Sequence, residues 1–245
     1  DRKPFYNGVV MMHSMLQVVD RRARTIKLYN GHDGKLISSK SLEYIPRDVC
    51  LISKDEVAVC LSNGTVIILS LKRFKFLQTG FDPFYSLVTW NSDKLVISGK
   101  KDAMLCWRIV SITDGRLDST HNICKGDWTN MAVKDNTVYI SCRTDHPINK
   151  GVHAFDLLNP NKQRFLYRHQ ELKRPGSIMA DREYVYVCDG NTIHQLTDSG
   201  QLVTIHTVSS SLLSMFYDDQ QGLLYTTSRK SNVITVYKME SLHQS

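Results

Sequence analysis

The stretch RPGSIMADREYVYVCDGNTIHQLTDSGQLV, from Arg174 to Val203, decides the fold. Apolar residues alternate with other residues in two runs inside it, and clusters of Gly, Asn and Asp separate the runs. Alternation with a period of two is typical of strands whose faces meet different surroundings, and such clusters are typical of tight turns. The stretch therefore predicts a meander of three or four antiparallel strands.

The same pattern recurs along the whole chain. Five further segments align with it, at residues 7–41, 46–80, 82–121, 127–169 and 211–239. Six units in 245 residues give a period of about forty, which is the spacing of four-stranded propeller blades. A β-sandwich has no such higher-order repeat. We therefore expect an all-β chain in which residues 1–245 form one six-bladed β-propeller domain.

The last unit supplies only three strands before Met239. We expect the N-terminal segment RKPFY, residues 2–6, to supply the fourth strand, so that the first and last blades share a sheet and close the ring. Closure would remove the exposed sheet edges that open meanders leave.

Composition limits the class of protein. An apolar share of 42% is enough for a core, and no stretch approaches the roughly twenty apolar residues of a membrane span. The N-terminus lacks the apolar core of a signal peptide, so we expect a cytoplasmic protein without a membrane partner. Because the chain begins at Asp1, we interpret it as a domain excised from a longer protein, whose absent domains would set the oligomeric state.

The six cysteines have no CxxC spacing, so we expect reduced core thiols and not a metal site.

The predicted strands sort the charged turns onto two faces of the propeller. We name the strands of each blade A to D from the axis outward. Turns from B to C and loops from D to the next A then emerge on one face, the top face, and the other turns emerge on the bottom face. The A–B turns hold eight acidic and four basic residues. The B–C turns hold four acidic and nine basic residues, which are Arg21, Arg22, Arg24, Lys100, Lys101, Arg143, Lys150, Arg229 and Lys230. The top face is therefore predicted to be basic.

The D–A loops bring aromatic rings to the same face. The candidate binding residues from these loops are Tyr44, Arg47, Tyr85, Lys125, Trp128 and Arg174, which join the nine basic residues of the B–C turns. Single-stranded RNA requires cations for its phosphates and flat rings for its bases. An acidic or phosphorylated protein segment would use the same cations with less need of rings. We favour RNA as the partner and keep the protein segment as the alternative.

Two units resemble the NHL repeat. The pattern PGSIMAD, then YVYVCD, then NTIHQLTDSGQLV carries the resemblance, and LQVVDRRARTIKLYNGHDGKLI repeats its second half. Asp189 and Asp20 match the repeat's Asp, whereas Leu61, Gly99, Arg143 and Ser228 replace it elsewhere. The divergent pattern is similar to the C-terminal NHL-like domains of tripartite-motif (TRIM) ubiquitin ligases. The resemblance implies a domain that recognises RNA, or substrates and adaptors for ubiquitination, while absent domains carry the transfer chemistry.

Catalysis within this chain is not expected. The predicted starts of the innermost strands include one carboxylate, Asp48, and no histidine, and the chain has neither HExxH nor GxSxG. We therefore expect no catalytic residues, no metal and no cofactor. A propeller hydrolase or lyase is the third alternative.

Overall fold

The computed structural model describes residues 4–70, 74–78, 84–102, 104–125, 128–144, 150–228 and 233–238. These residues form 23 strands and no helix. In this part of the chain there is accordingly no helix long and apolar enough to cross a membrane. The chain divides into two compact units, Asp1–Ile123 and Cys124–Ser245.

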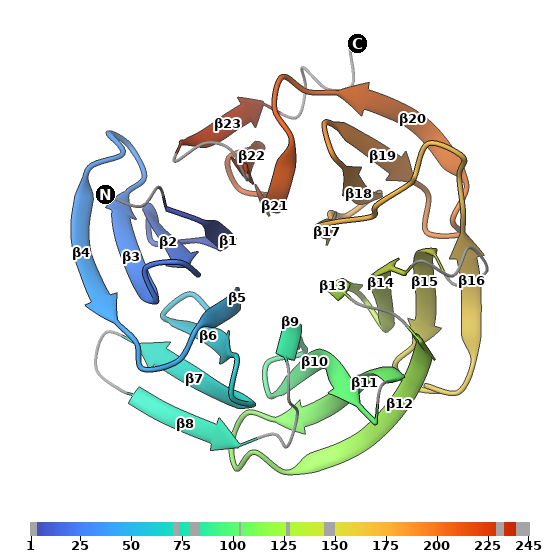
Figure 1. Ribbon diagram of the computed structural model, residues 1–245, viewed down its shortest axis with the longest axis horizontal. Coiled ribbons are helices and arrows are strands. Elements are labelled where there is room, and N and C mark those ends of the chain that lie inside the picture. The colour runs from blue at the N-terminus through green and yellow to red at the C-terminus, as the bar shows by residue number, and fades with distance from the viewer. Residues whose placement is uncertain are drawn as a thin grey trace. The chain divides into compact units, whose positions relative to one another are not determined.

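The first unit contains three antiparallel sheets, each a meander of consecutive strands (Figure 1). The first sheet consists of β1 (Tyr6–Met12), β2 (Met15–Asp20), β3 (Thr25–Asn30) and β4 (Leu36–Ser41). The second consists of β5 (Pro46–Ser53), β6 (Glu56–Leu61), β7 (Thr65–Ser70) and β8 (Phe74–Gln78). The third consists of β9 (Phe84–Trp90), β10 (Lys94–Lys101), β11 (Met104–Ser111) and β12 (Leu117–Lys125), whose last residues reach the second unit.

The second unit repeats this plan. Its first sheet consists of β13 (Trp128–Lys134), β14 (Thr137–Arg143), β15 (Gly151–Asp156) and β16 (Gln163–Tyr167). Its second consists of β17 (Ile178–Ala180), β18 (Val185–Asp189), β19 (Thr192–Leu196) and β20 (Leu202–Thr207). Its third consists of β21 (Leu212–Asp218), β22 (Leu223–Ser228) and β23 (Ile234–Lys238).

The predicted fold class, an all-β six-bladed propeller built from antiparallel blades, is confirmed. Each sheet lies within the residue range that the sequence repeat assigned to it, apart from the first residue of β1 and the last residues of β12 and β20. Among the described residues the sixth blade has three strands. The described part of RKPFY belongs to the first blade, because Tyr6 begins β1 and the Phe5 N–H donates to Asp20 of β2.

Side-chain hydrogen bonds join the innermost strands of neighbouring blades. In the first unit the Asn7 amide donates to the Arg47 carbonyl, 40 residues further along the chain. The Ser86 hydroxyl donates to Asp48 at 2.6 Å, across 38 residues. Both links join the start of one inner strand to the start of the next, so the inner strands β1, β5 and β9 run parallel. The B–C turns of these three blades therefore emerge on the same face of the first unit.

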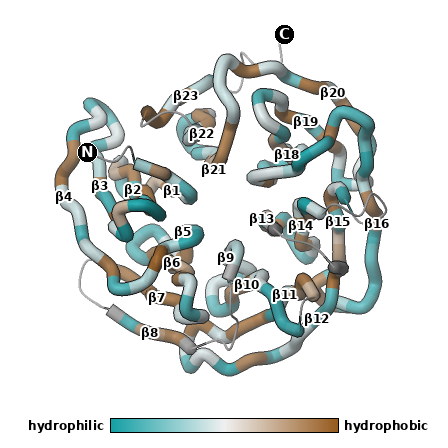
Figure 2. The backbone as a smooth tube through the Cα atoms, in the orientation of Figure 1, coloured by the Kyte–Doolittle hydropathy of each residue, from teal (hydrophilic) through white to brown (hydrophobic). Residues whose placement is uncertain are grey.

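Between the sheets lie apolar side chains and buried thiols. One core cluster of the first unit packs Cys50, Cys60 and Cys106 with aliphatic residues of the second and third blades. The outer surface is more polar, and Figure 2 shows the outer strand β16 as hydrophilic along much of its length. Five cysteines are free and buried, as predicted for core thiols. The side chain of Cys124 lies outside the described residues.

Candidate ligand-binding surface

Asp20 organises the most basic turn of the first unit. Its side chain is buried at the end of β2, and its Oδ1 accepts the N–H groups of Phe5, Arg22 and Ala23, each at 3.1 Å. Its Oδ2 accepts the Lys27 ammonium at 2.9 Å. Burial alone would raise the pKa of Asp20, but the hydrogen bonds from Ala23, Lys27 and Phe5 outweigh burial and lower the pKa. Asp20 therefore caps the β2–β3 turn through the N–H groups of Arg22 and Ala23.

Asp189 occupies the equivalent position in the second unit. It ends β18, and its Oδ2 accepts the Arg174 N–H at 2.8 Å. Asp20 is 15 residues beyond Phe5, and Asp189 is 15 residues beyond Arg174. In both blades, one carboxylate therefore fixes the loop that leads into the inner strand. This shared bond is the physical basis of the Asp in the two best-matching repeats.

The top face of the first unit carries a basic patch. We define it as two groups of cations on different blades, which are Arg21, Arg22 and Arg24 of the β2–β3 turn and Lys100 and Lys101 at the end of β10. Arg22, Arg24 and Lys101 are exposed. The Arg21 guanidinium lies 5.9 Å from the centroid of the Phe5 ring. Phe5, Arg21, Arg22 and Ile45 line an open depression beside this turn. The β2–β3 turn thus presents Arg21 and Arg22 beside one partly exposed ring, that of Phe5.

Two predicted binding residues of the first unit occupy bulges. Pairing of β5 with β6 skips Arg47, and pairing of β9 with β10 skips Tyr85. A bulge inserts an extra residue and changes the alternation of sides that follows it. Tyr85 is consequently buried, with 6% exposure, and its ring cannot form the stacking surface predicted for it. Arg47 is half-buried, with a buried Nε, whereas Tyr44 is 40% exposed.

The other predicted residues fall into three groups. Arg143, Arg174 and Lys150 are described, and Lys150 precedes β15 as a half-buried residue. The backbones of Lys125 and Trp128 lie in β12 and β13, but their side chains are outside the described residues. Arg229 and Lys230 lie outside the described residues altogether.

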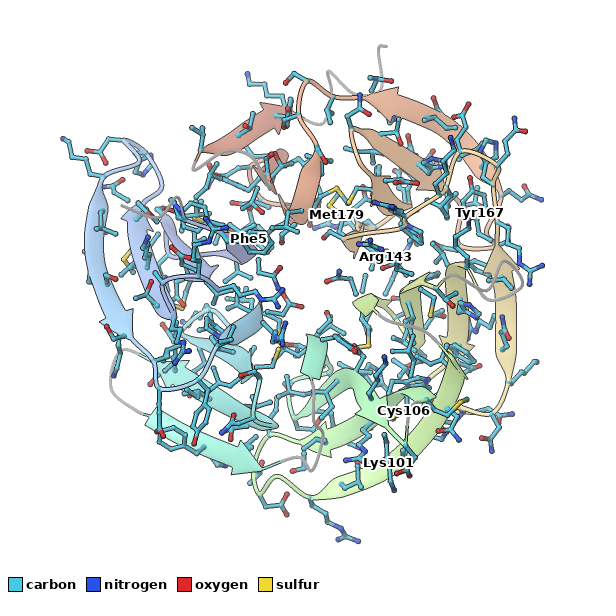
Figure 3. The ribbon with its side chains drawn as sticks, viewed as in Figure 1. Phe5, Lys101, Cys106, Arg143, Tyr167 and Met179 are labelled. Carbon is cyan, nitrogen blue, oxygen red and sulfur yellow. The ribbon has the colours of Figure 1, made fainter. Side chains whose placement is uncertain are left out.

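The second unit contains a pocket of about 210 Å³ where its three blades meet. Arg143 enters from the end of β14, Arg174 and Gly176 from the loop before β17, and Asp189 from the end of β18. Figure 3 shows Arg143 beside the inner strands of this unit. Asn130 of β13 and Ser211 of the loop before β21 add two uncharged polar side chains to the lining. The structure thus brings together Arg143 and Arg174, two of the predicted cations.

Neither of these guanidinium groups is neutralised by a described residue. In the part of the chain that the structure describes, neither Arg143 nor Arg174 forms an ion pair. Other arginines of the same unit are paired, as Arg164 is with Asp156 at 3.0 Å and Arg182 with Asp219 at 2.7 Å. The pocket therefore offers two arginine side chains to an anion.

Asn130 and Ser211 were missed from the sequence, because a single Asn in an inner strand or Ser in a serine-rich loop carries no distinguishing pattern. Phe5 was also missed as a binding candidate, since RKPFY was assigned to a strand of the last blade. The Arg21–Phe5 contact shows that the ring belongs with the basic patch.

Asp48, the carboxylate predicted at the start of an inner strand, is half-buried near the start of β5. Its Oδ2 accepts the Ser86 hydroxyl at 2.6 Å and the Leu87 N–H at 3.3 Å, and its Oδ1 accepts the Val49 N–H at 2.9 Å. Burial raises the pKa of Asp48 to about 7, against the opposing effect of these bonds. Its partners are the backbone and hydroxyl of the next blade, so Asp48 acts as a link between blades.

The described residues contain no group of three or more His, Cys, Asp or Glu side chains placed to hold a metal ion. Burial raises the pKa of the Cys50 thiol to about 12, which leaves little thiolate for nucleophilic attack at neutral pH.

Comparisons with known proteins identify the fold. No protein-family model matches the chain, and no curated protein matches it either. The chain is similar in structure to a gluconolactonase from Xanthomonas campestris, with 13% identity, a TM-score of 0.79, and coverage of 96% of this chain and 86% of that one. It is also similar to a chain of a nidogen/laminin complex, with 10% identity, a TM-score of 0.72, and coverage of 86% and 84%.

A third similar structure is the β-propeller domain of Cps50 (Swd1) from Myceliophteria thermophila, with 12% identity, a TM-score of 0.69, and coverage of 95% and 83%. At such low identities these similarities establish the fold alone. A propeller fold is suited to an interaction domain, because its blades present many turns and loops on a common face.

Proposed function

We propose that this chain is a non-catalytic recognition domain that binds an acidic segment of a partner protein on its top face. One observation carries the proposal: Arg143 and Arg174, from neighbouring blades, line one pocket without an ion pair in the described part of the chain. Arginine forks bind carboxylate and phosphate groups through paired hydrogen bonds. A pocket of this kind suits an acidic side chain of a protein better than an extended nucleic acid strand, which requires a continuous groove.

The exposure of the aromatic rings also favours a protein partner. RNA recognition needs rings on which bases stack, and each stacked base contributes roughly 1–3 kcal/mol. Tyr85 is buried and Tyr44 is exposed, so among the described side chains predicted for stacking, one of two is accessible. A protein segment that depends on arginine contacts does not need these rings.

RNA is the second candidate, and the basic patch of the first unit favours it. Arg22 and Arg24 are exposed there, the Phe5 ring lies under Arg21, and Tyr44 is exposed on the following loop. Cations beside rings are the combination that single-stranded RNA requires.

The parent protein is proposed to be a TRIM-type ubiquitin ligase in which this chain is the NHL-like recognition domain. The equivalent bonds of Asp20 and Asp189 support the resemblance in two blades. The sequence of the full-length protein tests it, because a TRIM ligase has a zinc-binding RING domain ahead of the propeller. The lack of such a domain would contradict this assignment.

Binding titrations decide between the two partners. A labelled Asp- and Glu-rich peptide and a labelled single-stranded RNA are each titrated at low and physiological salt. We expect Arg143→Glu to weaken peptide binding at least roughly tenfold, because it removes a charge-assisted contact and adds repulsion. Lys54→Glu, at an exposed turn of the bottom face, is the matched control and should leave binding unchanged.

RNA would be the favoured partner if the protein bound it more tightly than the peptide. This binding should then be lost when Arg21, Arg22, Lys100 and Lys101 are all changed to Glu. Binding of neither probe would reject both candidates. Because one similar structure is a gluconolactonase, hydrolysis of gluconolactone is measured with divalent cations added. Turnover above the uncatalysed rate would contradict the non-catalytic part of the proposal.

A further inference from the structure

The residues that line the pocket of the second unit restrict the chemistry of its ligand more than its positive charge alone does. Arg143 and Arg174 contribute two positive charges that do not titrate at physiological pH. Asp189 contributes one negative charge, but its Oδ2 is already occupied by the Arg174 N–H at 2.8 Å. The carboxylate thus fixes the backbone of the loop that carries Arg174, while the guanidinium group forms no ion pair with a described residue.

A backbone hydrogen bond joins two segments of the pocket lining. The Gly176 N–H donates to the Cys188 carbonyl at 2.8 Å. A Cβ at Gly176 would lie 3.1 Å from the Cys188 sulfur atom, so a larger residue would crowd this part of the lining. The available volume of about 210 Å³ suits the end of one side chain.

The neighbouring inner strand contributes a bulge to the same pocket. Pairing of β21 with β22 passes from Leu212 to Ser214, which leaves Leu213 without a cross-strand partner, and Leu213 lines the pocket. Bulges occur preferentially beside binding sites, where they interrupt the ladder and redirect the chain. Ser211 and Asn130 also line the pocket, and their side chains are uncharged and able to donate hydrogen bonds.

A phosphate monoester fits these groups better than a carboxylate does. It carries a charge of about −1.5 to −2 at pH 7 and three strong acceptor oxygens, whereas a carboxylate carries one charge and two oxygens. Attraction to two guanidinium groups scales with ligand charge, and three oxygens can satisfy two arginine forks and a hydroxyl together.

We propose that the pocket binds the phosphate group of a phosphoserine or phosphothreonine in a partner protein, with Arg143 and Arg174 as its two guanidinium ligands. This inference rests on the proposed function, because it names the chemistry of the acidic segment. It adds a requirement that the general function lacks, namely that phosphorylation of the segment controls binding.

The test uses a peptide library with a fixed central phosphoserine and randomised flanking residues, retained on the immobilised protein. Matched libraries carry Ser or Asp at the centre. We expect retention of the phosphoserine library and at least roughly tenfold weaker binding of selected peptides to Arg143→Gln or Arg174→Gln, since each variant loses a hydrogen bond to a charged group. Lys173→Gln is the matched control, because Lys173 is an exposed cation of the same loop outside the pocket lining.

The pH dependence provides a second readout. The second pKa of a phosphate monoester is about 6, so affinity should fall between about pH 7.5 and pH 5 as the phosphate loses one negative charge. Binding of an Asp-centred peptide should change less over this range, because a carboxylate remains ionised. Unchanged melting temperatures of the variants show that they are folded.

Three outcomes would overturn the inference: equal retention of phosphoserine and Ser libraries, equal weakening by Lys173→Gln, or tighter binding of a 5′-phosphorylated oligonucleotide than of any phosphopeptide. Failure of the proposed function gives a different pattern, because the Asp- and Glu-rich peptide then fails to bind as well. An acidic peptide that binds while phosphoserine adds nothing would leave the proposed function standing and reject the phosphate site.

Discussion

Replacing Asp20 tests whether one carboxylate holds the basic turn of the first blade. Asp20→Ala removes the acceptor of three backbone N–H groups and of the Lys27 ammonium. Each such bond contributes on the order of 1 kcal/mol net, so the free energy of unfolding should fall by about 3–4 kcal/mol. Urea denaturation at neutral pH, followed by tryptophan fluorescence, measures the change.

Asp20→Asn distinguishes the contributions of the two carboxylate oxygens of Asp20 to stability. All three backbone N–H groups donate to Oδ1, which an amide oxygen can replace, whereas Lys27 alone uses Oδ2. The Asn variant should therefore lose only about 1–2 kcal/mol. Because the pKa of Asp20 is lowered on folding, its contribution is complete above about pH 4 and is lost at lower pH.

Asp33→Ala is the control for Asp20→Ala, because Asp33 pairs with Lys35 at the surface. The Asp33 variant should shift the urea midpoint much less than the Asp20 variant. Equal losses for the Ala and Asn variants would refute the role of Oδ1 as the turn's acceptor. A loss below about 1 kcal/mol for Asp20→Ala would refute the whole account of the turn.

Three further predictions concern inner strands, glycines and thiols. Because burial raises the pKa of Asp48 to about 7, the folded state binds more protons between about pH 4 and 7, and stability should fall as pH rises through this window. Asp48→Asn should abolish this fall, and urea midpoints across the window that still fall with pH would contradict the assignment. Gly151→Ala should cost more than about 2 kcal/mol, since a Cβ would overlap the Tyr167 carbonyl oxygen at a φ of +144°. Gly190→Ala, at a φ of +61° in open space, should cost only about 1 kcal/mol, and equal urea midpoints for the two variants would argue against the overlap. Finally, the five described cysteines, Cys50 among them, are buried and should resist a thiol reagent until urea unfolds the chain; rapid labelling of more than one thiol in the native protein would be inconsistent with this core.

The fold was predictable because the same pattern of strands and turns occurs in several units of the sequence. Each unit shows alternation, then a turn signal, at similar offsets, and the links between inner strands preserve this period at 38 and 40 residues. The segment RKPFY was misassigned because five residues with one proline carry little pattern. Its place was decided by the bond from Phe5 to Asp20, which the sequence does not indicate.

The candidate site was less predictable than the fold. Charge on turns follows directly from the sequence, so Arg22 and Arg24 were correctly placed at an exposed turn, whereas Lys101 is exposed at the end of β10. The prediction for Tyr85 was wrong because the alternation of sides was read through the β9–β10 bulge, which directs the ring into the core. The convergence of Arg143 and Arg174 depends on how blades pack, which is a property of long-range contacts.

The links between inner strands have a consequence for synthesis on the ribosome. Asp48 lies in the second blade, but Ser86 and Leu87 of the third blade supply two of its three hydrogen bonds. A nascent chain that has emerged only as far as the second blade therefore carries a carboxylate that still lacks two of its three hydrogen-bond partners. The hydrogen bonds of the second blade are thus completed only when the third blade emerges. Until then, the growing polypeptide stays exposed to chaperones and proteases.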